Sequence, residues 1–495
     1  MLTLKQRLAG QPQGVTAIFF IQIFSTLGFA VLYSTLVFYM TKKLSFSVKD
    51  STAIFGVFGA FNYGLHLFGG YLGGRFLSNR NLFVGGMVLQ VIGCGIISSG
   101  DVMPLFVGLA FFLTGCGLNV TCLNLMLTQR FRPEDQRRES AFLWNYAGMN
   151  LGFCIGFTVS GHYELTQDYV SLFIFATVGN FVAIVLAALN WTVLKDLNTP
   201  LLTATPEKFK LRLLAGVLIL IGVIPIVFWN LKNASLSSEL VIAAGIAIAA
   251  VLIVVTLRHP DAREKKNMWA YLILAVGSLV FWTLYQMAPS GLNLFIDSNV
   301  DRRLFGFAIP PQWVQNLNPV VIIIGGPLMA IWFKNLRDKG WKIDIPQQFS
   351  ASLILIGIGF LVLPIGILFA DKNGLVNFNW IVLSYFFQSL GELLISPVGY
   401  AMIGRLAPTQ YQGVMMGAWM LVTGVASIMS SYFSGFIPEA SAGNALVTNQ
   451  VYSTIFSNLG WGSVAVGVVL IFLIPALRRL ISDAPHANGA TSPTT

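Results

Sequence analysis

The sequence predicts an all-α integral membrane protein of about fourteen transmembrane helices. Hydrophobic residues make up 55% of the 495-residue chain and charged residues only 10%, whereas a soluble domain carries about 25% charged residues. Long apolar runs recur along the chain, and each is near the roughly 20 residues that a spanning helix needs. They do not alternate in segments of about 10 residues, as a transmembrane β-barrel requires.

The apolar runs fall into groups of six, two and six helices. The first group is expected at 15–41, 51–78, 81–99, 103–130, 138–162 and 169–193. The extra pair is expected at 212–230 and 236–257. The last group is expected at 267–295, 317–336, 349–371, 377–406, 412–436 and 450–480. This is the outline of a two-halved secondary transporter, whose site lies between the halves near the membrane midplane.

The grouping predicts the domain organisation. We divide the chain into an N-terminal six-helix bundle (1–195), a linker with two extra helices (196–266), a C-terminal six-helix bundle (267–482) and a disordered cytoplasmic tail (483–495).

The basic residues concentrate in short loops between the apolar runs. The loops at 131–139, 258–267 and 334–342 are basic and lie on one side of the membrane if every run spans once. By the positive-inside rule, both termini are then cytoplasmic. The loop at 41–50 carries three lysines on the opposite side and is an exception. We therefore attribute the net charge of +10 to the cytoplasmic loops of a protein in a plasma or bacterial inner membrane. The expected partner is the lipid bilayer and not nucleic acid.

Nothing in the sequence indicates an enzyme, a cofactor or a metal site. No Walker-type phosphate loop occurs, so nothing points to ATP as the energy source. No group of His, Cys, Asp and Glu has metal-ligand spacing. The four cysteines lie inside apolar segments, and we interpret them as reduced core residues. They are Cys94, Cys116, Cys122 and Cys154.

One carboxylate stands in the middle of an apolar helix. Glu392 has about 13 apolar or small residues before it and a similar number after it, and a charge at the bilayer centre costs about 2.5–3.5 kcal/mol on insertion scales. Tyr385, Ser389 and Ser396 share its helix face. A polar face of this kind lines a substrate cavity or an aqueous path. The alternative is a protonated, structural Glu bonded to a neighbouring backbone group.

A second polar stripe occurs in the seventh bundle helix. Its members are Trp282, Tyr285, Gln286, Pro289 and Asn293. It indicates a second wall of the same cavity, and the alternative is an aromatic belt at the membrane interface. Two further residues have structural alternatives. Asn318, before Pro319, has the pattern of a helix N-cap, and Trp419 is core packing unless its indole faces the cavity.

Several motifs then resemble one family. FFQSLGELLISPVGYAMIGRLAP (386–408), LYQMAPSGLN, QNLNPVVIIIGGP and MGAWMLVTG are similar, in this order, to the proton-dependent oligopeptide transporters of the major facilitator superfamily. The resemblance covers the chain from about Phe20 to Arg479, with the extra helix pair of bacterial members. It implies the major facilitator fold, a carrier working by alternating access, and uptake of di- and tripeptides coupled to protons.

The resemblance also implies residue roles. Glu392 and Asn318 match residues that contact the peptide amino group. Ser396, Trp419 and Tyr63 match residues that line the pocket, and Asn150 with Gly152 matches the fifth-helix pattern of the family. With Tyr285 and Gln286 from the second stripe, these are the expected substrate-binding residues.

The N-terminal half departs from the family. Its first helix should carry Glu-x-x-Glu-Arg, but Gln22, Ser25 and Thr26 stand at those positions. Val120 stands where a fourth-helix lysine is expected, and Gly74 stands where the superfamily has a loop acid. Removing an acid–base network in one piece leaves no unpaired buried charge, whereas losing one partner would cost about 3–5 kcal/mol.

Two groups remain as proton-coupling candidates, Glu392 and His66. His66 lies one turn from Tyr63, and an imidazole with its ordinary pKa near 6.5 suits proton binding. Its alternative is a hydrogen-bonded structural histidine.

Three functions stay open on the sequence. The first is a symporter of di- and tripeptides or peptide-like amines, proton-linked through Glu392. The second is a carrier or exporter of a non-peptide amine with atypical or no proton coupling. The third is a substrate sensor, against which the lack of an obvious signalling domain argues. The exact substrate, the direction of transport and the oligomeric state do not follow from the sequence.

Overall fold

A computed structural model describes residues 11–132, 135, 137–197, 199–304, 306–341, 343–408, 410–438 and 445–481. The predicted tail at 483–495 lies outside these residues. The described chain is almost entirely helical, and twelve of its helices are long and apolar enough to cross a membrane. The predicted fold class is therefore confirmed.

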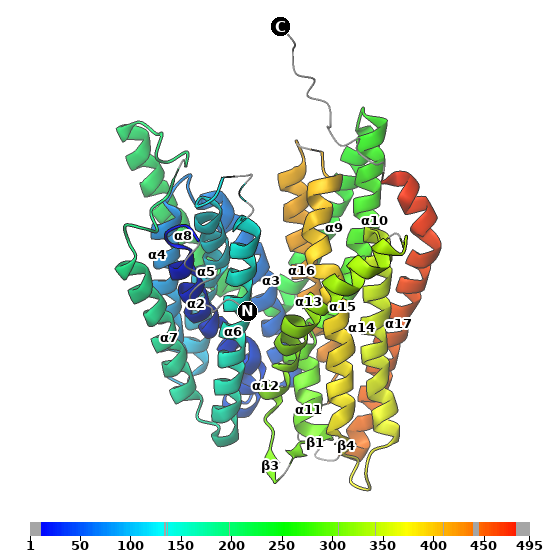
Figure 1. Ribbon diagram of the computed structural model, residues 1–495. Coiled ribbons are helices and arrows are strands. Elements are labelled where there is room, and N and C mark those ends of the chain that lie inside the picture. The colour runs from blue at the N-terminus through cyan, green and yellow to red at the C-terminus, as the bar shows by residue number, and fades with distance from the viewer. Residues whose placement is uncertain are drawn as a thin grey trace.

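The first six long helices form one bundle (Figure 1). They are α2 (Val15–Phe38), continued by the π-helical turn η1 (Tyr39–Lys43), α3 (Val48–Leu72), α4 (Asn79–Ile97), α5 (Val102–Thr128), α6 (Arg137–Thr166) and α7 (Tyr169–Leu189). Helices α2, α6 and α7 pack together on one side, and α3, α4 and α5 on the other. Side-chain caps define several starts, such as Ser47, which accepts a hydrogen bond from the Asp50 amide.

The second bundle begins with a broken helix. It contains α10 (Ala262–Tyr285), the π-helical turn η2 (Ala288–Leu292), α11 (Asn293–Asn299), α12 (Pro311–Val314), α13 (Leu317–Asp338), α14 (Ile345–Leu368), α15 (Phe378–Leu406), α16 (Gln412–Ser434) and α17 (Ala445–Leu480). The continuous helix predicted at 267–295 is thus wrong in detail. Pro289 has no amide hydrogen to continue the α-helical ladder, and the chain adopts a π turn there.

Four very short strands close one end of this bundle. Strand β1 (Val300–Asp301) pairs in parallel with β4 (Val376–Asn377), with Val300 opposite Val376. Strand β2 (Arg303–Leu304) pairs antiparallel with β3 (Phe307–Ala308).

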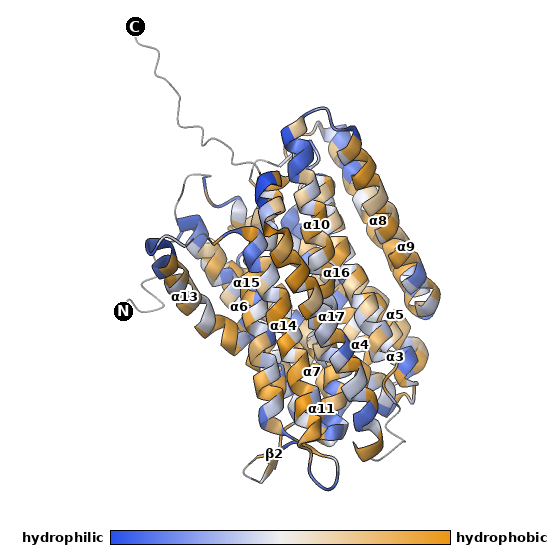
Figure 2. Cartoon of the chain, turned by 90° about the vertical axis from the view of Figure 1, so that its right-hand side faces the viewer, coloured by the Kyte–Doolittle hydropathy of each residue, from blue (hydrophilic) through white to orange (hydrophobic). Residues whose placement is uncertain are grey.

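Helices α8 (Pro206–Lys232) and α9 (Ala234–Arg258) form a hairpin outside the bundles. The two helices run along one flank and are predominantly hydrophobic (Figure 2). Helix α8 packs against α5 and α3, whereas α9 packs against α16, α3 and α10. Helix α8 therefore packs on the N-terminal bundle, and α9 packs mainly on the C-terminal bundle. The domain limits at 195 and 266 stay a prediction.

Helices α3 and α16 join the two bundles by close packing. A Cβ on Gly56 would collide with the Ser431 side chain, and one on Gly59 with the Ser427 side chain. Only glycine allows the helix backbones to approach so closely. The bundles also converge at the end that carries α11, α12 and the short strands (Figure 1). We call this the closed end.

Candidate functional site

Glu392 lies in the middle of α15 and is 8% exposed. The Asn318 Nδ2 donates to its Oε2 at 2.6 Å and also to the Ser389 hydroxyl at 3.1 Å. Asn318 is the second residue of α13, so the N-cap alternative is wrong: its amide is aimed at the neighbouring helix. Within the described residues, the hydrogen bond to this carboxylate comes from a side chain and not from a backbone group.

Tyrosines from both bundles surround this carboxylate. The Tyr285 side chain of α10 lies close enough to Glu392 to interact with its carboxylate. Tyr33 of α2, Tyr63 of α3 and Tyr146 of α6 lie close enough to interact with it electrostatically. An acid from the C-terminal bundle thus faces phenol groups of the N-terminal bundle, which is the arrangement of a binding site between two halves.

Gln286 connects the bundles directly. Its Oε1 accepts from the Tyr33 hydroxyl at 2.8 Å, and its Nε2 donates to the Tyr63 oxygen at 2.9 Å. Gln286 is 1% exposed. The predicted second stripe therefore faces the interior, and the aromatic-belt alternative is wrong for Tyr285 and Gln286.

A neutral hydrogen-bond network occupies the first-helix positions where the resemblance expects charges. Gln22 Nε2 donates to the Thr26 hydroxyl at 2.8 Å. Asn145 Nδ2 donates to Gln22 Oε1 at 3.3 Å and to Asn124 Oδ1 at 3.2 Å. In the described part of the chain, no Lys or Arg bonds to these side chains. Asn124 lies one turn from Val120 on α5, so an amide reaches this region from the helix that lacks the expected lysine.

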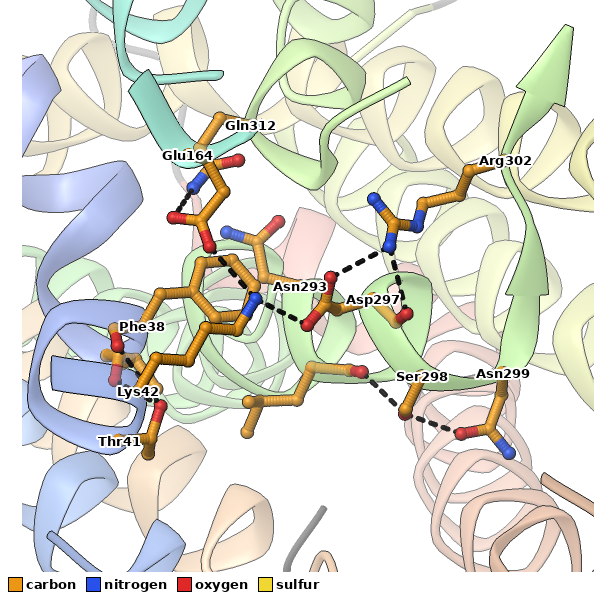
Figure 3. Close-up of polar contacts among 12 residues, drawn as sticks. Phe38, Thr41, Lys42, Glu164, Asn293, Asp297, Ser298, Asn299, Arg302 and Gln312 are labelled. Carbon is orange, nitrogen blue, oxygen red and sulfur yellow. Dashed lines mark hydrogen bonds and ion pairs between the residues drawn. The ribbon is translucent and has the colours of Figure 1, made fainter. Parts of the chain in front are cut away.

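A four-charge cluster joins the bundles at the closed end (Figure 3). Lys42 Nζ lies 2.9 Å from Glu164 and 2.7 Å from Asp297, and Arg302 lies 2.9 Å from Asp297. We call Lys42, Glu164, Asp297 and Arg302 the closing cluster. Its two cations balance its two anions. The Glu164 side chain is 4% exposed and also accepts from Tyr169 and Gln312.

The other predicted residues have separate surroundings. Ser396 is partly exposed. Trp419 is 2% exposed and packs against Gly399 and Phe349 in the C-terminal core. Asn150 donates to the Tyr146 carbonyl at 2.9 Å.

His66 packs its ring edge-on against Tyr63, with 6.1 Å between ring centroids. Its Nε2 is buried and has no hydrogen-bond partner in the described part of the chain.

Sequence reasoning missed the closing cluster, although a signal was present. The lysines of the loop at 41–50 were an unexplained exception to the charge pattern. In the structure, Lys42 is neutralised by Glu164 and Asp297, so at least this lysine does not act as a free topological charge.

Two helical bundles that converge at one end, with a buried acid in the middle of a helix between them, define a secondary membrane transporter. The chain matches the POT family over residues 15–449. It therefore belongs to the POT family, a family of transporters and not of enzymes.

Its relatives span its whole length. It is 30% identical over 492 residues to dipeptide and tripeptide permease A of Citrobacter koseri, covering 98% of this chain and 96% of the relative. It is 29% identical over 482 residues to dipeptide and tripeptide permease B of Salmonella typhimurium, covering 96% and 97%. Among solved structures, peptide transporter POT in complex with sulfate is 26% identical, covers 98% of this chain and 100% of that one, and has a TM-score of 0.84.

Proposed function

We propose that this protein moves peptides or peptide-like amines across the membrane by alternating access, with Glu392 as the group that meets both substrate and proton. The single observation behind this proposal is the buried Glu392 carboxylate, fixed by Asn318 at 2.6 Å and facing tyrosines of the other bundle. A substrate ammonium binds a carboxylate through strong charge-assisted hydrogen bonds. A proton neutralises the same carboxylate, so the two ligands compete and their binding is linked.

The remaining predicted residues complete the proposed pocket. Tyr63, Tyr285 and Gln286 supply phenol and amide groups beside the acid. Ser396, Asn150 and Trp419 stay assigned to the pocket wall on the resemblance.

We propose a cytoplasmic position for both termini in a bacterial inner membrane. The support is the sequence pattern: the loops at 131–139, 258–267 and 334–342 are basic and share one side of the membrane with both termini if every helix spans once. The closed end, with α11, α12 and the closing cluster, then faces outward. The structure would correspond to the state that is sealed toward the outside, and transport would require the closing cluster to separate.

The first experiment is uptake of a labelled dipeptide into vesicles that contain the purified protein. We expect accumulation with an inward proton gradient and only equilibration without it. Transport that ignores the gradient would favour the second candidate, a carrier or exporter of a non-peptide amine. The neutral network of Gln22, Thr26, Asn145 and Asn124 supports that candidate, because these side chains cannot titrate.

The substrate end opposite the amine gives a sharper prediction. A dipeptide carboxylate near Thr26 and Val120 would have no cation to bind it. Binding would therefore lose the charge-assisted hydrogen bond, which contributes about 1.5–3 kcal/mol. At 1.4 kcal/mol per tenfold, this is roughly ten- to a hundredfold in affinity. We expect the amidated form of a dipeptide to bind at least as tightly as its free acid. Titration of both forms against the purified protein measures this, and tenfold tighter binding of the free acid would reveal an unrecognised cation.

His66 is the second proposed proton group. We expect His66→Gln to retain uptake but to change its pH dependence, because the unpartnered Nε2 beside Tyr63 is the ring atom that would take up a proton. Uptake measured as a function of external pH checks this. His162→Gln is the control, since that histidine is exposed on the same bundle. A His66→Gln profile identical to wild type would remove this residue from the mechanism.

A further inference from the structure

A small basic pocket lies outside the transport site, where the α3–α4 turn meets the start of α8. It has a volume of about 210 Å³. Its lining residues are Tyr71, Arg75, Phe76, Pro200 and Arg212. Helix α8 packs closely on the α3–α4 turn because Gly216 has no side chain and lies directly against Phe76 and Leu77.

Two arginines line this pocket, and among the described residues no acid forms an ion pair with either of them. The Arg75 guanidinium lies 4.9 Å from the centre of the Tyr71 ring. The Arg212 Nη1 donates to the Pro200 carbonyl at 2.9 Å, which holds the side chain at the pocket. Within the described residues, neither arginine forms an ion pair, and Glu207, the only acid of α8, is exposed. The pocket therefore suits an anion.

The surroundings are apolar and exposed, as for a site at the bilayer surface. Tyr71 is 53% exposed, Leu202 is 56% exposed and Leu211 is 68% exposed. Lys208 lies one helical turn before Arg212 on the face that Gly216 turns toward the α3–α4 turn. An anionic headgroup at the arginines would leave acyl chains against the exposed leucines. A free phosphate ion would use the arginines alone.

We propose that this pocket binds the phosphate headgroup of an acidic phospholipid. Basic pockets between transmembrane helices are suited to such headgroups, and each Lys or Arg near the surface adds about 1 kcal/mol. The bound lipid would bridge the α3–α4 turn of the N-terminal bundle and the first turns of α8.

Native mass spectrometry of the detergent-purified full chain tests the proposal. The probes are phosphatidylglycerol and phosphatidylcholine with identical acyl chains, and inorganic phosphate. We expect wild type to retain phosphatidylglycerol preferentially and Arg75→Ala/Arg212→Ala to bind it about thirtyfold more weakly. The singles Arg75→Gln and Arg212→Gln, which keep a polar side chain, should each lose about fivefold.

Lys334→Ala/Lys339→Ala is the matched control. It removes two exposed cations near the end of α13 and should bind phosphatidylglycerol like wild type. Unchanged binding in both arginine singles and the arginine double variant would overturn the site. Inorganic phosphate bound as tightly as phosphatidylglycerol, or equal retention of the two lipids, would overturn the assignment to an acidic lipid.

Discussion

Glu392→Gln is expected to abolish proton-driven accumulation of substrate while leaving expression and folding intact. Gln fills nearly the same volume and still accepts the Asn318 hydrogen bond, which is 2.6 Å long in the native protein. It cannot bind a proton at physiological pH or neutralise a substrate ammonium. Vesicles with an inward proton gradient should therefore show substrate inside only at the external concentration.

The matched control is Glu239→Gln, the same change at an exposed acid of α9. It should accumulate substrate like wild type. Undiminished accumulation by Glu392→Gln would refute the central role of this acid. Full coupling in the Glu392→Gln/His66→Gln double variant would exclude both groups and require a proton site elsewhere in the chain.

Lys42→Met is expected to open the closed end. The substitution leaves Glu164, whose side chain is 4% exposed, without its cation and leaves Asp297 with Arg302 alone. A fully buried ion pair that loses one partner costs about 3–5 kcal/mol and a surface pair about 0–1 kcal/mol. Lys42 and Asp297 are about one-quarter exposed, so we expect about 2 kcal/mol, or roughly a thirtyfold shift in the conformational equilibrium.

Spin labels at Lys49→Cys and Arg303→Cys, both exposed at the closed end, measure this shift as a longer inter-label distance. Lys43→Met is the control, because this neighbour is exposed and forms no ion pair in the described part of the chain. Asp297→Asn should act in the same direction as Lys42→Met. An unchanged distance distribution in both variants would show that the closing cluster does not hold this end.

The fold followed from the sequence to a useful degree because membrane helices are specified by composition and length. Thirteen of the fourteen expected helices occur within several residues of their predicted limits, and the one expected at 267–295 is interrupted by the π turn at Ala288–Leu292. The errors have local causes. The π turn at η2 depends on Pro289, and the end of α3 at Leu72 depends on a turn in which Gly74 adopts a φ of 74°. The hydrophobic pattern of the sequence predicts neither the π turn nor the turn after α3.

The site was predicted where residues share a helix and missed where they come from different ones. Helical spacing placed Ser389 beside Glu392, and the family resemblance added Asn318. The contact of Gln286 with Tyr33 and the reach of Asn124 to Asn145 depend on how separate helices cross. Spacing along one helix carries no information on such crossings. The same holds for Lys42, whose partners are 122 and 255 positions away in the chain.

The geometry of the α8–α9 hairpin should follow the relative position of the two bundles during transport. The first half of α8 packs on the N-terminal bundle through Gly216. The end of α9 is seated on the C-terminal bundle, where His259 contacts Gln410 and Tyr411. Near the turn, Ser237 bonds Asn230 and keeps the legs together. When the two bundles rock relative to one another, the distance between the first half of α8 and the end of α9 should therefore change. Fluorophores at these two positions would report each turnover without entering the substrate path.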